Sequence, residues 1–187
     1  MPFFGEITER EFWTLIHGMV LGALFLLAFG GGFAGVWSLK QRLLTTEGVE
    51  ERTPRLLAGT VIMAVVAWLT VITGTFLVYP WYRATPPEGI DRALQSEALA
   101  EFPRFWLLAN EATANWHEFG MEWKEHVAWI APFLATAVAF AVAYYGLQLI
   151  RREEIRRAVM VFMTLAFLAA GAAGLYGALI TKAAAVG

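Results

Sequence analysis

The chain has 187 residues, of which 58% are hydrophobic and 16% are charged, and its mean hydropathy is +0.56. This composition excludes a soluble domain with a single buried core and is typical of an integral membrane protein. The net charge of -2 provides no basic field for nucleic acid, so nucleic acid is not an expected partner. The absence of cysteine excludes a disulfide, a thiolate metal site and a c-type haem.

Four segments are long and apolar enough to cross a lipid bilayer, which takes about 20 residues at a rise of about 1.5 Å each. They cover residues 12–39, 56–79, 126–150 and 158–180. The sequence therefore predicts an all-α fold, a four-transmembrane-helix bundle that forms one domain over residues 1–187. Because the first residues are acidic where a signal peptide is basic, we expect the first span to remain in the mature protein.

The basic residues predict the orientation of the bundle. They gather in the connection between the first and second spans and in the turn between the third and fourth spans: Lys40, Arg42, Arg52 and Arg55, then Arg151, Arg152, Arg156 and Arg157. By the positive-inside tendency, both connections face the cytoplasm. Both termini and the acidic connection of residues 80–125 are then outside. We expect a multi-pass protein of the bacterial cytoplasmic membrane.

The outer connection of residues 80–125 is too long for a plain turn and predicts helices at the membrane surface. Apolar residues recur at a spacing of four from Ile90 to Phe102, which indicates a short interfacial amphipathic helix. Pro103 is expected to end this helix. A second helix is expected to begin around Thr113 and to continue without a break into the third span.

All three histidines lie near the outer edge of the predicted bundle. His17 and His126 come from different helices at similar depth, which suits two axial ligands on opposite faces of a b-type haem. Gly18 and Gly22 beside His17 provide room for a flat macrocycle, or they serve close helix packing. The structural alternative for His17 is a hydrogen bond to a neighbouring helix.

A second interpretation uses the same region as an outward-facing copper or iron site, because imidazole with thioether or carboxylate ligands suits these metals. Its candidate ligands are His17, His117, Met121, Glu122 and His126, with Met19 as an alternative thioether. On one continuous helix His117 and His126 point in opposite directions, so they share a metal only if the helix breaks between them. Glu122 lies one turn before His126 and is a candidate acceptor for its imidazole.

A four-span bundle with histidines of different helices at similar depth, and with glycines close by, resembles the membrane-anchor b-type cytochromes of respiratory complexes. The resemblance implies haem b and electron transfer between quinones and a partner subunit. The three histidines exclude a second bis-histidine haem, which many of those cytochromes hold. The segments FWTLIHGMVLGALFLLAFGGGFAG and MEWKEHVAWIAPFLATA are also similar to a group of bacterial four-span proteins, and that similarity implies a fold and no activity.

These observations predict an integral membrane subunit of a respiratory or electron-transfer complex, in contact with other membrane subunits. Its redox partner is a quinone or a basic soluble electron carrier attracted by the acidic outer connection. The alternative is a non-catalytic accessory or assembly subunit that binds no cofactor and whose histidines are structural. The sequence leaves open whether the chain is itself an enzyme. It shows no phosphate-binding glycine loop, nucleophile elbow or zincin pair.

Overall fold

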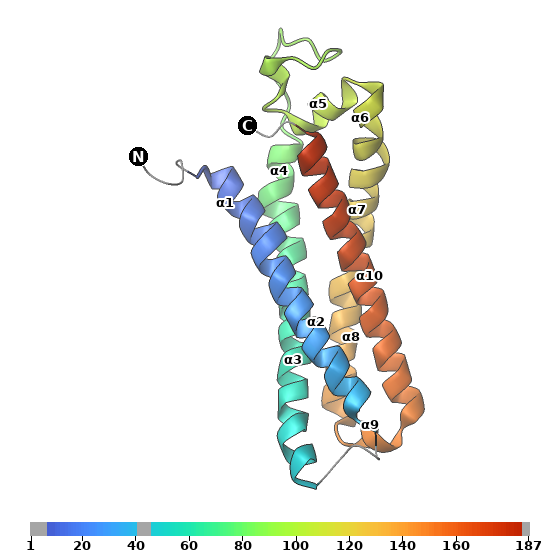
Figure 1. Ribbon diagram of the computed structural model, residues 1–187. Coiled ribbons are helices and arrows are strands. Elements are labelled where there is room, and N and C mark those ends of the chain that lie inside the picture. The colour runs from blue at the N-terminus through green and yellow to red at the C-terminus, as the bar shows by residue number, and fades with distance from the viewer. Residues whose placement is uncertain (1–6, 41–45, 185–187) are drawn as a thin grey trace.

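The fold is a bundle of helices, seen in a computed structural model that describes residues 7–40 and 46–184. No β-strand occurs within these two ranges. Four helices there are long and apolar enough to cross a membrane, and we call them spans one to four: Glu9–Ser38, Glu51–Tyr82, Glu111–Tyr145 and Glu153–Ala183. The expected all-α four-helix bundle is confirmed (Figure 1).

Spans one and two are each built from consecutive helical segments. Span one consists of α1 (Glu9–Leu15), a π-helical segment (Ile16–Val20) and α2 (Leu21–Ser38). Span two consists of α3 (Thr46–Thr73) from Glu51 onward, a π-helical segment (Gly74–Val78) and α4 (Tyr79–Tyr82).

Span three has the most segments of the four. It begins with α6 (Glu111–Asn115), a π-helical segment (Trp116–Met121) and α7 (Glu122–Val127), and it ends with α8 (Ile130–Tyr145). The short α9 (Gln148–Arg151) leads into span four, which is the single helix α10 (Glu153–Ala183).

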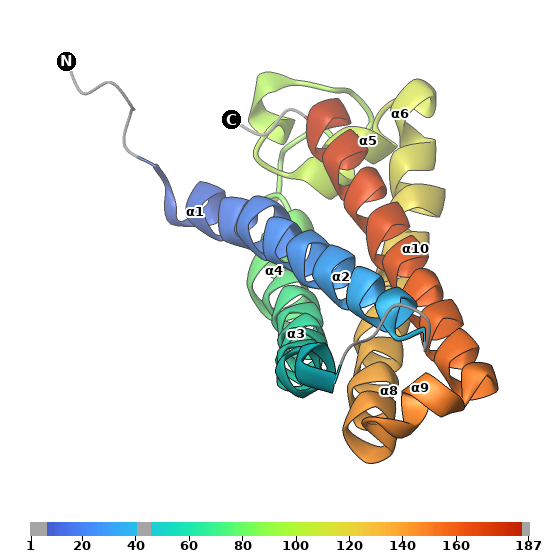
Figure 2. The same cartoon turned by 60° about the horizontal axis from the view of Figure 1, so that its bottom comes forward.

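Each span packs extensively against two others, so that spans one and three occupy opposite corners of the bundle. The start of α1, the end of α10 and the connection between spans two and three lie at one end, which we call the outer end (Figure 1). The start of α3 and α9 lie at the opposite end, which carries the arginine clusters and which we call the inner end (Figures 1 and 2). Span one crosses the other helices obliquely in both views.

A continuous apolar core fills the bundle toward its inner end. It includes fully buried Met63, Val138 and Met163, and the rings of Phe29 and Phe167 stack with their centroids 4.6 Å apart. Large apolar side chains also cover the outside of the bundle, with Leu27 as much as 73% exposed. An apolar exterior around a packed interior is what a helix bundle in lipid requires, since the bilayer is the solvent.

One buried arginine closes the inner end of the bundle. The Arg156 Nη1 atom donates to the carbonyl oxygens of Leu39 at 3.1 Å, Leu149 at 3.0 Å and Ile150 at 3.2 Å. Leu39 follows the last residue of α2, and the other two belong to α9. Carbonyl groups at helix ends lack helical partners, and a cation nearby satisfies them. Arg156 therefore links the end of α2 to α9, in addition to being one of the basic residues that predict the orientation of the bundle.

The outer connection differs from its expected structure. The expected amphipathic helix from Ile90 to Phe102 is wrong, because the chain there is helical only over Glu97–Leu99. The Asp91 carboxylate accepts a hydrogen bond from the Ala93 N–H at 2.8 Å, and a local bond of this kind competes with the helix. Pro103 begins the helix α5 (Pro103–Leu108) instead of ending one, as prolines do in a first turn.

The boundaries of span three also differ from the expected range of residues 126–150. The helix begins at Glu111, where the Asn110 side chain accepts from the Ala112 N–H at 2.9 Å and caps it. It ends at Tyr145, because Gly146 adopts a φ of +46°, which favours glycine. The helix expected to begin around Thr113 and to continue into the third span is confirmed as one helix from Glu111 to Tyr145, with the π-helical segment and a turn after α7 inside it.

Replacing Arg156 with methionine tests whether its hydrogen bonds to the backbone carbonyls stabilise the fold. We expect Arg156→Met to lower the free energy of unfolding by about 1.5–3 kcal/mol, because the buried carbonyls lose charged hydrogen-bond donors. Unfolding of the detergent-solubilised protein measures the change. The matched control is Arg157→Met, since Arg157 is exposed and pairs only with Glu153 on its own helix. Equal stability of the two variants would contradict the assignment.

Candidate functional site

Three spans change from α-helical to π-helical hydrogen bonding in the outer half of the bundle. The shift to bonds five residues apart is seen where the N–H of Leu21 donates to the Ile16 carbonyl, that of Tyr79 to the Gly74 carbonyl, and that of Glu122 to the His117 carbonyl. Each π-turn inserts a residue and redirects the side chains around it, and such turns are frequent at functional sites. The outer half is thus where the helices depart from regular packing.

His17 lies in the first of these segments and packs against the second. Its Nδ1 atom donates to the Thr70 carbonyl oxygen at 2.8 Å, so that Nε2 carries no proton in the neutral ring. The ring fits because residue 74 is glycine: a Cβ there would lie 2.5 Å from His17 Cε1. The hydrogen bond to a neighbouring helix, expected as the structural alternative for His17, is confirmed.

His117 belongs to a separate apolar cluster at the outer end. Its ring is buried, and Nδ1 lies 2.8 Å from the Tyr82 hydroxyl oxygen in a hydrogen bond. The cluster around this pair includes Leu107, Met121 and Ile180, so the candidate ligand Met121 is a packing residue here. The pair joins spans two and three across the core.

His126 is exposed on the surface of span three. Its Nδ1 atom donates to the backbone carbonyl oxygen of Glu122 at 2.7 Å. Glu122 therefore holds the His126 ring as expected, although through its backbone oxygen and not through its carboxylate.

The structure does not bring the expected ligands together. His17 packs on span two, His117 lies in the outer cluster and His126 is exposed, and no hydrogen bond joins any two of them in the described ranges. Within the same ranges, no three histidine, aspartate or glutamate side chains are close enough to hold a metal ion. A haem between His17 and His126 stays a prediction from the sequence, and we derive no step through it.

Gly18 and Gly22 do not serve close helix packing. A Cβ added at either would meet no atom within 4 Å, and Gly18 is exposed. The candidate thioether Met19 is 69% exposed on the same stretch of span one. This part of span one faces away from the other helices.

Lys124 is the feature that sequence analysis missed. Its side chain is half-buried between spans three and four, with the Nζ atom 2.9 Å from where a Cβ of Gly177 would be. The ammonium is within electrostatic range of His17 and Glu125, yet it has no hydrogen bond or ion pair among the described residues. A cation inside a membrane bundle is costly without a partner and is functional by default. We call Lys124, His17 and Gly177 the Lys124 site.

A pattern in the sequence does mark Lys124. It follows His117 and Met121 at a spacing of i, i+4 and i+7, which puts all three side chains on one face of a helix. Two of the three are buried in the outer cluster. Lys124 is therefore a charged residue on a helix face whose other two residues, His117 and Met121, are buried.

Two further polar atoms of the outer half also lack partners. The Oε1 atom of Glu125 and the Nε atom of Arg104 are buried and make no hydrogen bond in the described structure. Native proteins leave few buried polar atoms without a hydrogen-bond partner, so each such atom needs an explanation. Among the described residues, the buried side-chain atoms without hydrogen-bond partners lie at the outer end of the bundle.

Comparisons with protein-family models, curated proteins and solved structures find no match to this chain.

Replacing Gly74 with alanine tests the packing of His17. We expect Gly74→Ala to destabilise the protein by about 1–3 kcal/mol, because the new methyl group overlaps the imidazole. Adding His17→Ala to that variant is expected to recover part of the loss, which a double-mutant cycle measures. The control is Gly171→Ala, where a Cβ meets nothing within 4 Å. If both alanine variants are equally stable, the close approach of His17 and Gly74 is wrong.

Replacing Lys124 with methionine tests whether its ammonium lacks a partner. We expect Lys124→Met to raise the melting temperature of the protein purified without added ligand, because an unpaired charge is removed from the interior. The control is Lys182→Met, which removes an exposed lysine near the end of α10. A lower melting temperature for Lys124→Met alone would show that the chain itself satisfies the ammonium.

Proposed function

We propose that the chain is a membrane subunit of an electron-transfer complex and that the Lys124 site binds a quinone headgroup. The observation that carries the proposal is the Lys124 ammonium, which lies inside the bundle without an acceptor among the described residues. A bound molecule with acceptor oxygens would complete its hydrogen bonds.

A quinone suits this site chemically. Its carbonyl oxygens accept hydrogen bonds and its ring is uncharged, so it reaches an intramembrane cation from the bilayer. Lys124 offers up to three donors to a quinone carbonyl. His17, with Nδ1 bonded to the Thr70 carbonyl, offers Nε2 as an acceptor for a quinol hydroxyl. The site thus contains a donor suited to the oxidised form and an acceptor suited to the reduced form.

The proposed complex lies in a bacterial cytoplasmic membrane with the arginine-rich inner end toward the cytoplasm. The Lys124 site is then in the outer half of the bilayer, and both termini are outside. Reduction of the quinone takes two electrons and two protons, and the electrons come from a partner subunit or a basic soluble carrier. Haem b, copper and iron stay predictions from the sequence.

A second candidate is an accessory subunit without a bound cofactor. The observation that favours it is that each histidine already makes a structural hydrogen bond: His17 to Thr70, His117 to Tyr82 and His126 to Glu122. In this case the acceptor for Lys124 comes from a neighbouring subunit.

Titration of the purified protein with a short-chain quinone tests the proposal. We expect decylubiquinone or a short-chain menaquinone to raise the melting temperature of the wild type and of Lys182→Met in a concentration-dependent way. Lys124→Met is expected to lose at least about tenfold in affinity, or about 1.4 kcal/mol. Its own melting temperature without quinone shows whether it is folded.

Two results would overturn the quinone proposal. One is a wild type that binds neither quinone, and the other is a Lys124→Met variant that binds as tightly as the wild type. If the wild type binds no quinone and Lys124→Met fails to co-purify with membrane partners that the wild type retains, the accessory subunit is the better account.

A further inference from the structure

A groove between spans one and two opens at the inner end of the bundle, far from the Lys124 site along the helices. It has a volume of about 570 Å³. Its walls are apolar, with Leu27 and Leu56 among the lining residues, and its mouth carries Arg52 and Arg55. The groove thus joins an apolar channel to a pair of cations.

The glycines of this region divide into two kinds. A Cβ at Gly32 would lie 3.1 Å from Met163, and one at Gly35 would lie 3.0 Å from Leu56, so these two allow close helix packing. A Cβ at Gly31 or Gly59 would meet nothing within 4 Å, although both residues line the groove. Gly31 and Gly59 therefore leave space open that no side chain of the described residues fills.

The cations at the mouth are available. Arg52 and Arg55 are exposed and three residues apart on α3, which puts them on the same face of the helix. Arg52 makes no ion pair or hydrogen bond among the described residues, and Arg55 reaches Glu51 only at 3.4 Å. An anion at this mouth would meet at least one uncompensated guanidinium.

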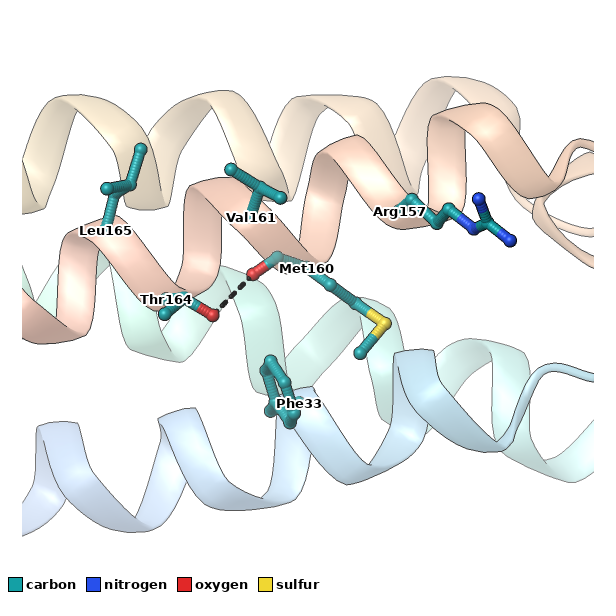
Figure 3. A pocket seen from close by; sticks show the side chains of 6 residues that line it. All are labelled: Phe33, Arg157, Met160, Val161, Thr164 and Leu165. Carbon is teal, nitrogen blue, oxygen red and sulfur yellow. Dashed lines mark hydrogen bonds between the residues drawn. The ribbon is translucent and has the colours of Figure 1, made fainter.

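A second groove, of about 450 Å³, provides an internal comparison on the other side of span one. Figure 3 shows Phe33 of span one on the side of span four that carries Met160 and Thr164, with Val161 and Leu165 on the other side of that helix and Arg157 at one end. There the Arg157 guanidinium donates to the Glu153 carboxylate at 2.7 Å. That groove is also apolar, but its cation already has an ion-pair partner.

We propose that the groove between spans one and two binds an anionic phospholipid, with an acyl chain over Gly31 and Gly59 and the phosphate at Arg52 and Arg55. The occupant is argued from charge complementarity at the mouth together with the open apolar channel behind it. Basic pockets between membrane helices are sites for anionic headgroups. The groove beside Arg157 is then expected to take lipid tails without preferring an anionic headgroup.

Native mass spectrometry of the detergent-purified protein with added lipid tests the site. Phosphatidylglycerol is the anionic probe and phosphatidylcholine the zwitterionic one. We expect the wild type to retain phosphatidylglycerol at least about tenfold more tightly, a difference of about 1.4 kcal/mol. Arg52→Gln with Arg55→Gln is expected to abolish this preference. The matched control is Arg151→Gln with Arg152→Gln, which removes the same charge from exposed residues at the same end and is expected to keep it.

A variant that fills the groove distinguishes a lipid whose acyl chain lies in the groove from a lipid headgroup that is attracted only to the arginines. Gly59→Leu leaves both arginines in place and is expected to weaken phosphatidylglycerol retention. Equal retention of the two lipids by the wild type, or equal loss in both double variants, would overturn the proposal. A photocrosslinker at Leu27 that joins to a polypeptide instead of a lipid would also overturn it, since a partner helix would then occupy the groove.

Discussion

The hydrocarbon core of a bilayer offers no water to a polar group, so every donor and acceptor inside this bundle must find its partner in the chain or in something bound to it. The helices meet this requirement for most of the backbone. At their ends and at buried side chains the requirement must be met locally. How it is met differs between the two ends of the molecule, and this difference underlies the functional proposal.

Two cations show the contrast. At the inner end, buried Arg156 is surrounded by three carbonyl oxygens of two neighbouring segments. At the outer end, half-buried Lys124 lies beside Gly177 and has no acceptor among the described residues. Glu125 and Arg104 leave further buried atoms without partners nearby. Arg156 thus finds its acceptors within the fold, whereas Lys124 has none among the described residues, and the functional proposal rests on this difference.

The sequence predicts the fold well because the four apolar stretches have a single stable solution in lipid. It predicts less of the outer connection, where a spacing of four from Ile90 to Phe102 suggested a helix that local bonds such as Asp91 to Ala93 replace. It also fails to orient side chains near the π-helical segments. An inserted residue there changes the face on which each later side chain lies, and the sequence alone does not reveal where such a residue is inserted.

The same limit explains why the sequence does not identify Lys124 as a site residue. From the sequence it belongs to an acidic, interfacial stretch where a lysine is ordinary, and only the packing of α7 against α10 places it in the interior. Its significance depends on Gly177, more than fifty residues later in the chain, which leaves room for the ammonium. The helical spacing from His117 and Met121 can place Lys124 on an inward-facing side of the helix, but its long-range complementarity to Gly177 is not visible in local periodicity.

The most direct test of the account is to identify what the protein carries when it is purified from its native membrane. Solvent extraction and mass spectrometry of the wild type and of Lys124→Met would give the small molecules bound to each. The account predicts a quinone in near-stoichiometric amount with the wild type and its loss from Lys124→Met, while the phospholipid content is unchanged. Equal quinone content in the two proteins, or none in the wild type, would contradict it.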